Sequence, residues 1–584
     1  MKFDDILKIV GEFGPYQIRV YSLVCILVFT TSWESLITVF IGANVDHWCA
    51  VPEWDSNDCS AYGLTASECE LSKKNGSIPS NYTSDGELEY AQCEKYNVSG
   101  VGFWPGMDPS NYTDGSTGTI PCDAGWEYDD SQYKSTIVSD FELVCGNENL
   151  NQISQTIYYG GFLAGSIIFG VMSDVIGRWW TLQICTIVRL VTGVLIAFAP
   201  ELWVYSLLRF FQGMAGVATY IILFILGTEY VGPSKRNIAG ILFCVPYSLG
   251  YMLLALIAFY LPYWRTLELV VTAPVIPFFL LMMFMPESAR WLMSVGQYEK
   301  AEKIIIKIAE VNKATAPDPI FTEEFKKKET INREQNKATI LDLFRTRTVC
   351  LRTLNLIFSW MVHSMVYSGL SLNTSNLGVN DYVAFTISGA VEIPAYLLTI
   401  FTVEYFGRKP SLVTLVLLGG VACLTTAAIP EGVWLTTVAM IGKFGIAGSF
   451  GVLYLYTAEL YPTSIRTVAV GTCSMFSRVA NMLAPLILTL DKFWAPMPLV
   501  IYGSVAVLAG ILALFLPETR GLTLPETRAE GENFGKKMAA DDIANTDKKE
   551  NGILSVSKGV ELEGVNNTQE KGDTADYVNP SYVI

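Results

Sequence analysis

Long apolar segments recur along the whole chain and limit the folds open to it more than any other feature. One of them, YSLVCILVFTTSWESLITVFI, covers residues 21–41, and similar runs cover 156–172 and 412–429. A helix needs about 20 apolar residues to cross the hydrocarbon core of a bilayer. A soluble core would not need so many segments of this length, and the composition, 51% hydrophobic and 16% charged, is typical of a membrane protein. The chain is therefore predicted to be an all-α polytopic membrane protein.

We expect twelve membrane spans of this kind. The first follows a short polar N-terminus without a small-residue cleavage site, so it is interpreted as a membrane helix and not as a cleaved signal peptide. The expected spans are 18–42, 152–172, 179–199, 203–226, 238–261, 267–285, 350–371, 382–402, 411–429, 433–456, 467–490 and 496–516.

The distribution of charge orients these spans. Segment 286–349 holds 12 Lys and Arg, whereas segment 43–150 holds 4, against 19 Asp and Glu. Because basic loops stay in the cytoplasm, the first is predicted to be a central cytoplasmic loop and the second a large extracellular loop. The other expected domains are a cytoplasmic N-terminus (1–17), an N-terminal six-helix half (18–285), a C-terminal six-helix half (350–516) and a disordered cytoplasmic tail (517–584).

The extracellular loop carries signs of the secretory pathway. Its even number of cysteines predicts three disulfides, whose connectivity the sequence leaves open. Four Asn-X-Ser/Thr sequons predict N-glycosylation. We therefore expect a multi-pass glycoprotein of the plasma membrane. The cysteines are Cys49, Cys59, Cys69, Cys93, Cys122 and Cys145, and the sequon asparagines are Asn75, Asn81, Asn97 and Asn111.

The C-terminal tail ends in two short motifs, DYVNPSYVI. Residues 579–582 could form a turn that presents Tyr582 to a trafficking adaptor. The terminal Tyr582-Val583-Ile584 could add a strand to a PDZ domain. Both motifs are short and common, so the alternative is that they are incidental.

Three pairs of polar motifs repeat at a nearly constant spacing. SDVIGRWW (173–180) matches TVEYFGRKP (402–410), TEYVGPSKR matches AELYPTSIR, and PESARW matches PETRGL, at separations of 230, 230 and 231 residues. Two parallel six-helix halves explain this spacing, because an even number of helices returns each motif to the same side of the membrane. Such halves are typical of the major facilitator fold, in which the substrate site lies between them near the midplane.

The paired residues of these motifs are predicted to act in gating on the cytoplasmic side. Gly177 would allow close packing or a positive φ, Arg178 could reach an acid or a helix C-terminus, and Asp174 a helix N-terminus. Such contacts would latch two helices together, and rocking of the halves would break them. The alternative is that these residues only satisfy loop charges and set the topology. The set is Asp174, Gly177, Arg178, Glu229, Arg236, Glu404, Gly407, Arg408, Glu459 and Arg466.

Ionisable residues in the middle of spans are costly and mark candidate substrate or ion sites. Glu392 and Arg478 lie near the middle of the eighth and eleventh spans. At matching depth they could pair with each other in the empty protein, or divide a substrate that carries both signs. Lys443 is expected either in an ion pair or in contact with substrate. Glu34, closer to the outer end of the first span, could be hydrated at a cavity mouth.

Aromatic residues at helical spacing supply the other half of this predicted site. Trp360 and Tyr367 share a helix face, and Tyr220 and Phe224 lie one turn apart, as do Phe243 and Tyr247. Aromatic rings attract organic cations, although ordinary helix packing produces the same pattern.

Other functional classes find less support. The chain has 2 histidines and no nucleophile motif, so neither a histidine-based metal centre nor an enzyme is expected, and no cofactor or nucleic-acid partner is predicted. A non-transporting receptor that uses the extracellular loop is the alternative from another class.

Taken together, the motifs resemble the organic cation/carnitine transporters, a family of organic-ion transporters within the major facilitator superfamily. The motifs are SDVIGRWW, PESARWL, SLNTSNLG, VEIPAY, GKFGIAGSFGVLYLYTAELYPTSIR and LPETRG, and the resemblance covers residues 10–525. It implies transport by alternating access, possible sodium or proton coupling, and a substrate cavity lined by Trp360, Tyr367, Tyr247, Tyr220 and Phe224.

Two positions distinguish branches of that family. Amine-cation members typically have an aspartate where this chain has Arg478, and anion exchangers a lysine where it has Tyr396. This chain therefore matches neither the amine-cation members nor the anion exchangers. Its residues would suit a zwitterion such as carnitine or a betaine, with Glu392 near the ammonium and Arg478 near the carboxylate. The alternative is a broad facilitator of organic cations or anions.

Overall fold

The computed structural model describes residues 3–54, 59–82, 88–107, 119–317, 319–323, 325–326, 339–462, 465–522, 525 and 528–534. The chain divides into a large unit, Met1–Glu532, and a C-terminal unit, Asn533–Ile584. The sequon at Asn111 and the motifs at Tyr582 and Ile584 lie outside the described residues.

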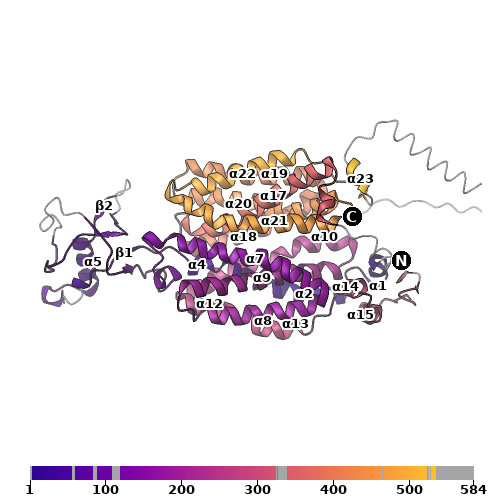
Figure 1. Cartoon of the computed structure of the whole chain (residues 1–584), viewed down its shortest axis with the longest axis horizontal. Coiled ribbons are helices and arrows are strands. Elements are labelled where there is room, and N and C mark those ends of the chain that lie inside the picture. Colours follow the sequence, from indigo (N-terminus) through magenta and orange to yellow (C-terminus); the bar gives the residue numbers. More distant parts are fainter. Residues whose placement is uncertain are drawn as a thin grey trace, which may run out of the picture. The chain divides into compact units, whose positions relative to one another are not determined.

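The N-terminal half consists of helices that cross the predicted membrane six times (Figure 1). The first crossing is broken into three helices and the fifth and sixth into two each. The helices are α2 (Pro15–Phe29), α3 (Thr31–Leu36), α4 (Thr38–Ile41), α7 (Asn149–Ile176), α8 (Arg178–Ile196), α9 (Leu202–Tyr230), α10 (Pro233–Leu242), α11 (Cys244–Tyr260), α12 (Trp264–Thr272) and α13 (Val275–Met282).

The C-terminal half repeats this arrangement with fewer breaks. Its helices are α17 (Arg347–Leu372), α18 (Asp381–Tyr405), α19 (Arg408–Thr425), α20 (Val433–Leu460), α21 (Arg466–Leu488) and α22 (Met497–Ala513). The two halves meet where α7 packs on α21 and α11 on α18.

Among the described residues, 11 helical segments are long and apolar enough to cross a membrane, and α22 is a shorter apolar helix at the twelfth expected position. The fold is thus the predicted twelve-helix arrangement.

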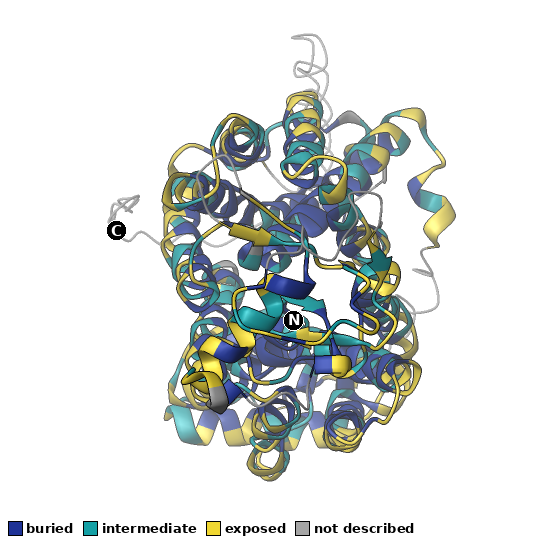
Figure 2. Ribbon diagram, turned by 90° about the vertical axis from the view of Figure 1, so that its left-hand side faces the viewer, coloured by how far each residue is buried: buried dark blue, intermediate teal, exposed yellow. Residues whose placement is uncertain are grey.

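Burial across these helices is the inverse of that in a soluble protein. Large apolar side chains such as Phe401 and Phe515 are 70% and 79% exposed, whereas Arg189, Arg209 and Glu392 are buried. Figure 2 shows the exposed faces on the outside of the helix bundle and buried faces within it. Apolar outer faces and paired inner charges suit a bilayer, which solvates hydrocarbon but not ions.

The segment predicted to be the extracellular loop, 43–150, contains strands, whereas the described membrane spans are helical. Three two-stranded antiparallel sheets pair β1 (His47–Cys49) with β6 (Trp126–Tyr128), β2 (Ser80–Tyr82) with β3 (Leu88–Tyr90) and β4 (Glu94–Lys95) with β5 (Ile120–Pro121), beside α5 (Ala66–Ser77). Sheets of two strands are marginal alone. Disulfides reinforce them and join Cys49 to Cys122, Cys59 to Cys69 and Cys93 to Cys145. The sequon residues Asn75, Asn81 and Asn97 are exposed.

At the other end of the bundle from these strands, short helices cover the ends of the N-terminal half (Figure 1), on the side predicted to be cytoplasmic. They are α1 (Phe3–Val10), α14 (Ala289–Ser294) and α15 (Tyr298–Asn312). Helix α1 packs against α15, and Ile6, Leu7 and Val10 are buried.

Candidate functional site

A cavity of about 150 Å³ lies between the two halves. The N-terminal half lines it with residues of α3, α7, α9 and α11, and the C-terminal half with residues of α17, α18, α20 and α21. The walls therefore come from the same crossings of each repeat. We call this space the central cavity. Its lining is Thr31, Ser35, Tyr158, Tyr159, Phe162, Gly216, Val217, Tyr220, Cys244, Tyr247, Ser364, Tyr367, Ser368, Tyr396, Phe450, Gly451, Tyr454, Arg478 and Asn481.

Arg478 is the charged residue among those lining residues. Its Nε atom is buried without a hydrogen-bond partner among the described residues. It does not pair with Glu392, contrary to one expectation from the sequence, because Glu392 pairs with Lys443 instead. A guanidinium is a planar set of donors that matches a carboxylate. The cavity thus presents a cationic donor without a protein counter-ion to anything that enters it.

Glu392 and Lys443 form an ion pair behind the cavity wall, with Lys443 Nζ 3.2 Å from Glu392 Oε1 and both side chains at most 1% exposed. The Ser248 hydroxyl donates to the Glu392 carboxylate at 2.7 Å, and Lys443 donates to the Ser371 hydroxyl. Neither residue belongs to the lining. The Glu392 carboxylate, which was expected to receive a substrate ammonium, is already neutralised because it pairs with Lys443.

Lys443 also contacts the cavity wall from behind. Its ammonium lies 3.8 Å from the centre of the Tyr367 ring and 5.6 Å from that of Tyr251. A cation over an aromatic face is attracted by the ring quadrupole. One face of Tyr367 is therefore occupied by an internal cation.

Most of the predicted aromatic residues lie in or next to the cavity. Tyr220, Tyr247 and Tyr367 line it, whereas Trp360 and Phe224 do not. Trp360 is fully buried, donates to the Thr457 hydroxyl at 2.9 Å and packs edge-on against Tyr454, 4.3 Å between ring centres. Phe224 packs on Phe243.

Six further aromatic residues line the cavity that the sequence did not predict there, although Tyr396 had been named as a position that differs between branches of the family. Tyr158, Tyr159 and Phe162 follow one another on α7 at near-helical spacing, and this spacing could have found them. Tyr396 belongs to the VEIPAY motif, and Phe450 and Tyr454 lie on α20 within GKFGIAGSFGVLYLYTAELYPTSIR. Nine of the 19 lining residues are aromatic, so the cavity suits an organic cation on most sides.

The repeated glycines have the same role in both halves. Gly177 and Gly407 have φ of 107° and 103° and precede α8 and α19. The two carboxylate oxygens of Glu287 accept from the backbone N–H groups of Arg178 and Trp179, each at 3.1 Å. Glu518 caps α19 in the same way, 3.0 Å from the N–H groups of Arg408 and Lys409. A Cβ at either glycine would run into the capping carboxylate.

The helix cap corrects one expectation and explains the third motif pair. Asp174 was expected to reach a helix N-terminus, but its carboxylate pairs with Arg178 at 2.8 Å. The caps come instead from the glutamates of PESARW and PETRGL, and these residues were not among the predicted gating residues. Carboxylates at helix N-termini are favoured by the exposed N–H groups and the helix dipole.

The repeated arginines use different partners in the two halves. Arg408 donates to both oxygens of Glu459, with Nη2 2.9 Å from Oε1. Glu404, the counterpart of Asp174, is exposed and is not part of this pair. In the N-terminal half Arg178 pairs with Asp174 instead. Glu229, the counterpart of Glu459, accepts a hydrogen bond from the Ser288 hydroxyl.

The last pair of predicted gating residues, Arg236 and Arg466, holds loops at the helix ends that are predicted to be cytoplasmic. Arg236 donates to the Thr228 carbonyl at 3.3 Å and pairs with Asp4 at 2.8 Å. Arg466 donates to the Tyr461 carbonyl at 3.3 Å. Like the contacts of the glycines and of Arg178 and Arg408, these do not join one half to the other, so the motif residues hold the helices of each half together with the segments that flank it.

Glu34 is buried and paired, which corrects the expectation of a hydrated position. Its carboxylate lies 2.8 Å from Nε of Arg189, and both side chains are 2% exposed. Arg209 donates to the Glu34 carbonyl at 3.1 Å and to the Thr38 hydroxyl at 2.6 Å. These charges brace the helices of the N-terminal half outside the cavity.

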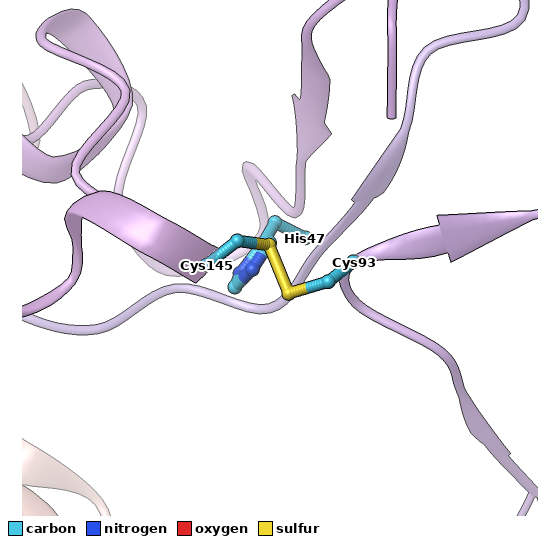
Figure 3. Close-up of side chains that lie close together, drawn as sticks. All are labelled: His47, Cys93 and Cys145. Carbon is cyan, nitrogen blue, oxygen red and sulfur yellow. A yellow bond between two sulfur atoms is a disulfide. The ribbon is translucent and has the colours of Figure 1, made fainter. Parts of the chain in front are cut away.

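A cluster of potential metal ligands lies in the segment predicted to be the extracellular loop. His47, Cys93 and Cys145 place their ligand atoms within 4.8 Å of one another. Figure 3 shows the imidazole beside the bond that joins the two sulfur atoms. Because both sulfurs are consumed by a disulfide, the trio offers one imidazole and no thiolate, and it is not a metal site in this oxidised form.

Comparison with known proteins places this geometry among membrane carriers. Residues 124–530 match the family described as "Sugar (and other) transporter". The chain is 37% identical to the organic cation transporter protein of Drosophila melanogaster, over 93% of this chain and 97% of the relative. It is 34% identical to the human organic cation/carnitine transporter 2, over 90% and 93%.

The solved structures support the fold. The xylose transporter XylE from E. coli, in an inward-open conformation, superposes with a TM-score of 0.57, at 16% identity over 88% of this chain and 99% of that one. This likeness concerns the arrangement of helices.

Proposed function

Because this chain belongs to the organic cation/carnitine transporter family of the major facilitator superfamily, we propose that it carries small organic cations or zwitterions, of the carnitine and betaine type, across the plasma membrane by alternating access. Membership in this family makes the chain a membrane transporter and not an enzyme.

The observation that carries the substrate class is Arg478 in the aromatic central cavity. A substrate carboxylate would take the guanidinium, whose Nε has no partner among the described residues. A quaternary ammonium on the same molecule would lie against aromatic rings such as Tyr220 and Tyr247, which also line the cavity. Such contacts are worth about 2 kcal/mol where water is excluded. Glu392 contributes less than the sequence suggested, because Lys443 neutralises it.

Two observations support alternating access: the cavity lies between the two halves, and the contacts of the repeated motifs do not link one half to the other. The cavity takes its walls from both halves, whereas the glycine, arginine and glutamate contacts of the motifs do not join one half to the other. Two rigid halves that rock about a shared site would expose it to each side in turn. We propose that the motif residues keep each half rigid during this motion.

The broader alternative is a facilitator of many organic cations or anions. The names of the relatives favour organic cations, and an aromatic cavity accepts cations of many shapes. A carrier without carboxylate recognition would move a simple quaternary cation as well as it moves carnitine. A receptor that transports nothing would move neither.

The test is uptake by cells that express the chain, with labelled carnitine, a quaternary cation without a carboxylate and an organic anion. Arg478→Ala should lower carnitine uptake at least about tenfold, the loss of one charged hydrogen bond, and should leave uptake of the simple cation largely intact. Arg19→Ala, which removes an exposed charge of α2 outside the cavity, is the matched control.

Surface labelling of the same cells tests the plasma-membrane location and corrects uptake for abundance. Repeating the assay without sodium, and at two external pH values, tests ion coupling. Unchanged carnitine uptake by Arg478→Ala would overturn the carboxylate role. Absence of uptake of every substrate by the parent chain would favour the receptor.

A further inference from the structure

A second cavity opens at the cytoplasmic ends of α8 and α13, beside α15. Its volume is about 480 Å³. Three tryptophans, two lysines and several apolar side chains line it, and we call it the Trp–Lys pocket. The lining is Ile176, Trp179, Trp180, Met283, Met285, Glu287, Trp291, Leu292, Gln297, Lys300, Lys303 and Ile304.

The pocket lies at the boundary between the membrane spans and the cytoplasmic helices. Trp180 stands in the first turn of α8, a candidate membrane span, and is 59% exposed. Met283, directly after α13, is 57% exposed. Tryptophan is enriched at the level of lipid headgroups, and exposed apolar side chains at the end of a span face acyl chains. One wall of the pocket is therefore continuous with the lipid-facing surface.

The tryptophan walls are held in place by hydrogen bonds. The Trp179 indole donates to the Met282 carbonyl at 3.0 Å, and the Trp291 indole donates to the Asp174 carbonyl at 2.9 Å. Their N–H groups are thus already used, and the rings present a fixed surface.

The opposite wall is cationic. Lys300 and Lys303 lie on α15, both are exposed, and neither forms an ion pair with any described residue. Helix α15 buries Ala301 and Ile305 on its inner face, which directs the lysines outward.

Glu287 is the acidic residue of the lining, and it does not neutralise these lysines. Its carboxylate is engaged by the backbone N–H groups at the start of α8. The pocket therefore has two free ammonium groups beside an apolar, membrane-level wall.

We propose that the Trp–Lys pocket binds an anionic lipid of the cytoplasmic leaflet, with the headgroup phosphate on Lys300 and Lys303 and the acyl chains along Trp180 and Met283. Anionic lipids of this leaflet attract basic segments at the membrane surface, by about 1 kcal/mol for each lysine. A soluble phosphate could use the lysines but would gain nothing from the apolar wall, which is why the combination points to a lipid.

The test uses the full chain reconstituted in nanodiscs of phosphatidylcholine, alone or with phosphatidylserine or phosphatidylinositol bisphosphate. Native mass spectrometry after release into detergent counts the lipids that stay bound. The parent should retain an anionic lipid, and Lys300→Gln/Lys303→Gln should lose it, with at least about tenfold lower occupancy. The matched control, Lys235→Gln/Lys307→Gln, removes two exposed cytoplasmic lysines that do not line the pocket.

The outcomes separate the proposal from general charge attraction. Equal loss in both double variants, or no preference of the parent for anionic lipid, would overturn it. Displacement of the bound lipid by soluble inositol trisphosphate at equal concentration would assign the pocket to a soluble phosphate instead. The thermal unfolding of each variant in phosphatidylcholine shows whether it is folded, and Trp180→Leu, which keeps both lysines, should weaken retention without a change of charge.

Discussion

At the scale of single residues, the charge balance of the central cavity depends on which base pairs with Glu392. Arg478 and Lys443 lie on neighbouring crossings of the C-terminal half, and either could neutralise the acid. Lys443 does so, at 3.2 Å, and is held there by Tyr367 and Ser371. Arg478 is left to the cavity. The proposed selectivity for carboxylate-bearing substrates would therefore depend on Lys443, which does not line the cavity.

Replacing Lys443 by Met should uncover the Glu392 carboxylate and shift preference toward simple cations. We expect the ratio of quaternary-cation uptake to carnitine uptake to rise about tenfold, because an unpaired buried carboxylate attracts a cation strongly. Removing one partner of a buried pair costs about 3–5 kcal/mol, so the single variant should also unfold at lower temperature. Uptake competition and thermal unfolding of the purified protein measure both effects.

The double variant Glu392→Gln/Lys443→Met is the control for this prediction. It removes both charges, so it should recover most of the stability and lose the gain in cation preference. An uptake ratio that stays at the parental value in Lys443→Met would contradict the masking role of the lysine.

At the scale of elements, two helices begin in the same unusual way. A glycine with positive φ ends the preceding segment, and a glutamate from about 110 positions further along the chain caps the new helix. The same sequence of buried and exposed positions covers 171–180 and 401–410. The glycine and the glutamate cap are therefore the same in both halves. The arginine after each glycine pairs with a different acid, Asp174 for Arg178 and Glu459 for Arg408.

Gly407→Ala should lower the free energy of unfolding by about 1–2 kcal/mol through its positive φ. It should lower it by about 1 kcal/mol more through displacement of the Glu518 cap, because the added methyl group would lie 2.9 Å from the Glu518 carboxylate. Gly471→Ala is the matched control, since Gly471 lies inside α21 with no atom within 4 Å of its added Cβ. It should be neutral or slightly stabilising. Equal unfolding temperatures for the two variants would contradict this account of the repeated glycine.

At the scale of the whole transporter unit, Met1–Glu532, the two halves are joined at the ends predicted to be extracellular. The Tyr133 hydroxyl, in the segment before α7, donates to the Asp381 carboxylate at the start of α18 at 2.7 Å. Phe40 packs on Phe385, with 4.7 Å between ring centres. Burial raises the pKa of Tyr133 and the Asp381 carboxylate raises it further, so the phenol stays protonated and remains the donor. With the orientation predicted from the charges, we propose that these contacts close the cavity toward the extracellular side.

Tyr133→Phe should open the external side more often. A hydrogen bond to a charged group is worth about 1.5–3 kcal/mol, so the outward-open population should rise about tenfold. Cys244 lines the central cavity, and its modification by a membrane-impermeant thiol reagent added outside reports this opening. Cys244→Ser identifies the label, and Tyr62→Phe, at an exposed tyrosine of the extracellular loop, is the control. An unchanged rate in Tyr133→Phe would remove this contact from the external gate.

Much of this organisation could be predicted because it is periodic. Apolar runs of membrane length, the spacing of 230 residues and the excess of Lys and Arg at 286–349 are properties of the chain itself. The family follows from the same motifs, because the repeated glycine, arginine and glutamate serve local caps that need fixed residue types at fixed positions.

The pairing of charges could not be predicted, since it depends on distances between helices that are far apart in sequence. Glu392 could have met Arg478 or Lys443, and only packing of α18 against α20 decides for Lys443. The same applies to Glu287 and Glu518, whose role as caps needs a contact across about 110 residues. A duplicated twelve-helix transporter could thus be read from the amino acids, because periodicity and local backbone chemistry depend on neighbouring residues. The charge that faces the central cavity follows from packing, because in a low-dielectric interior each charge is neutralised by whatever partner packing brings within reach.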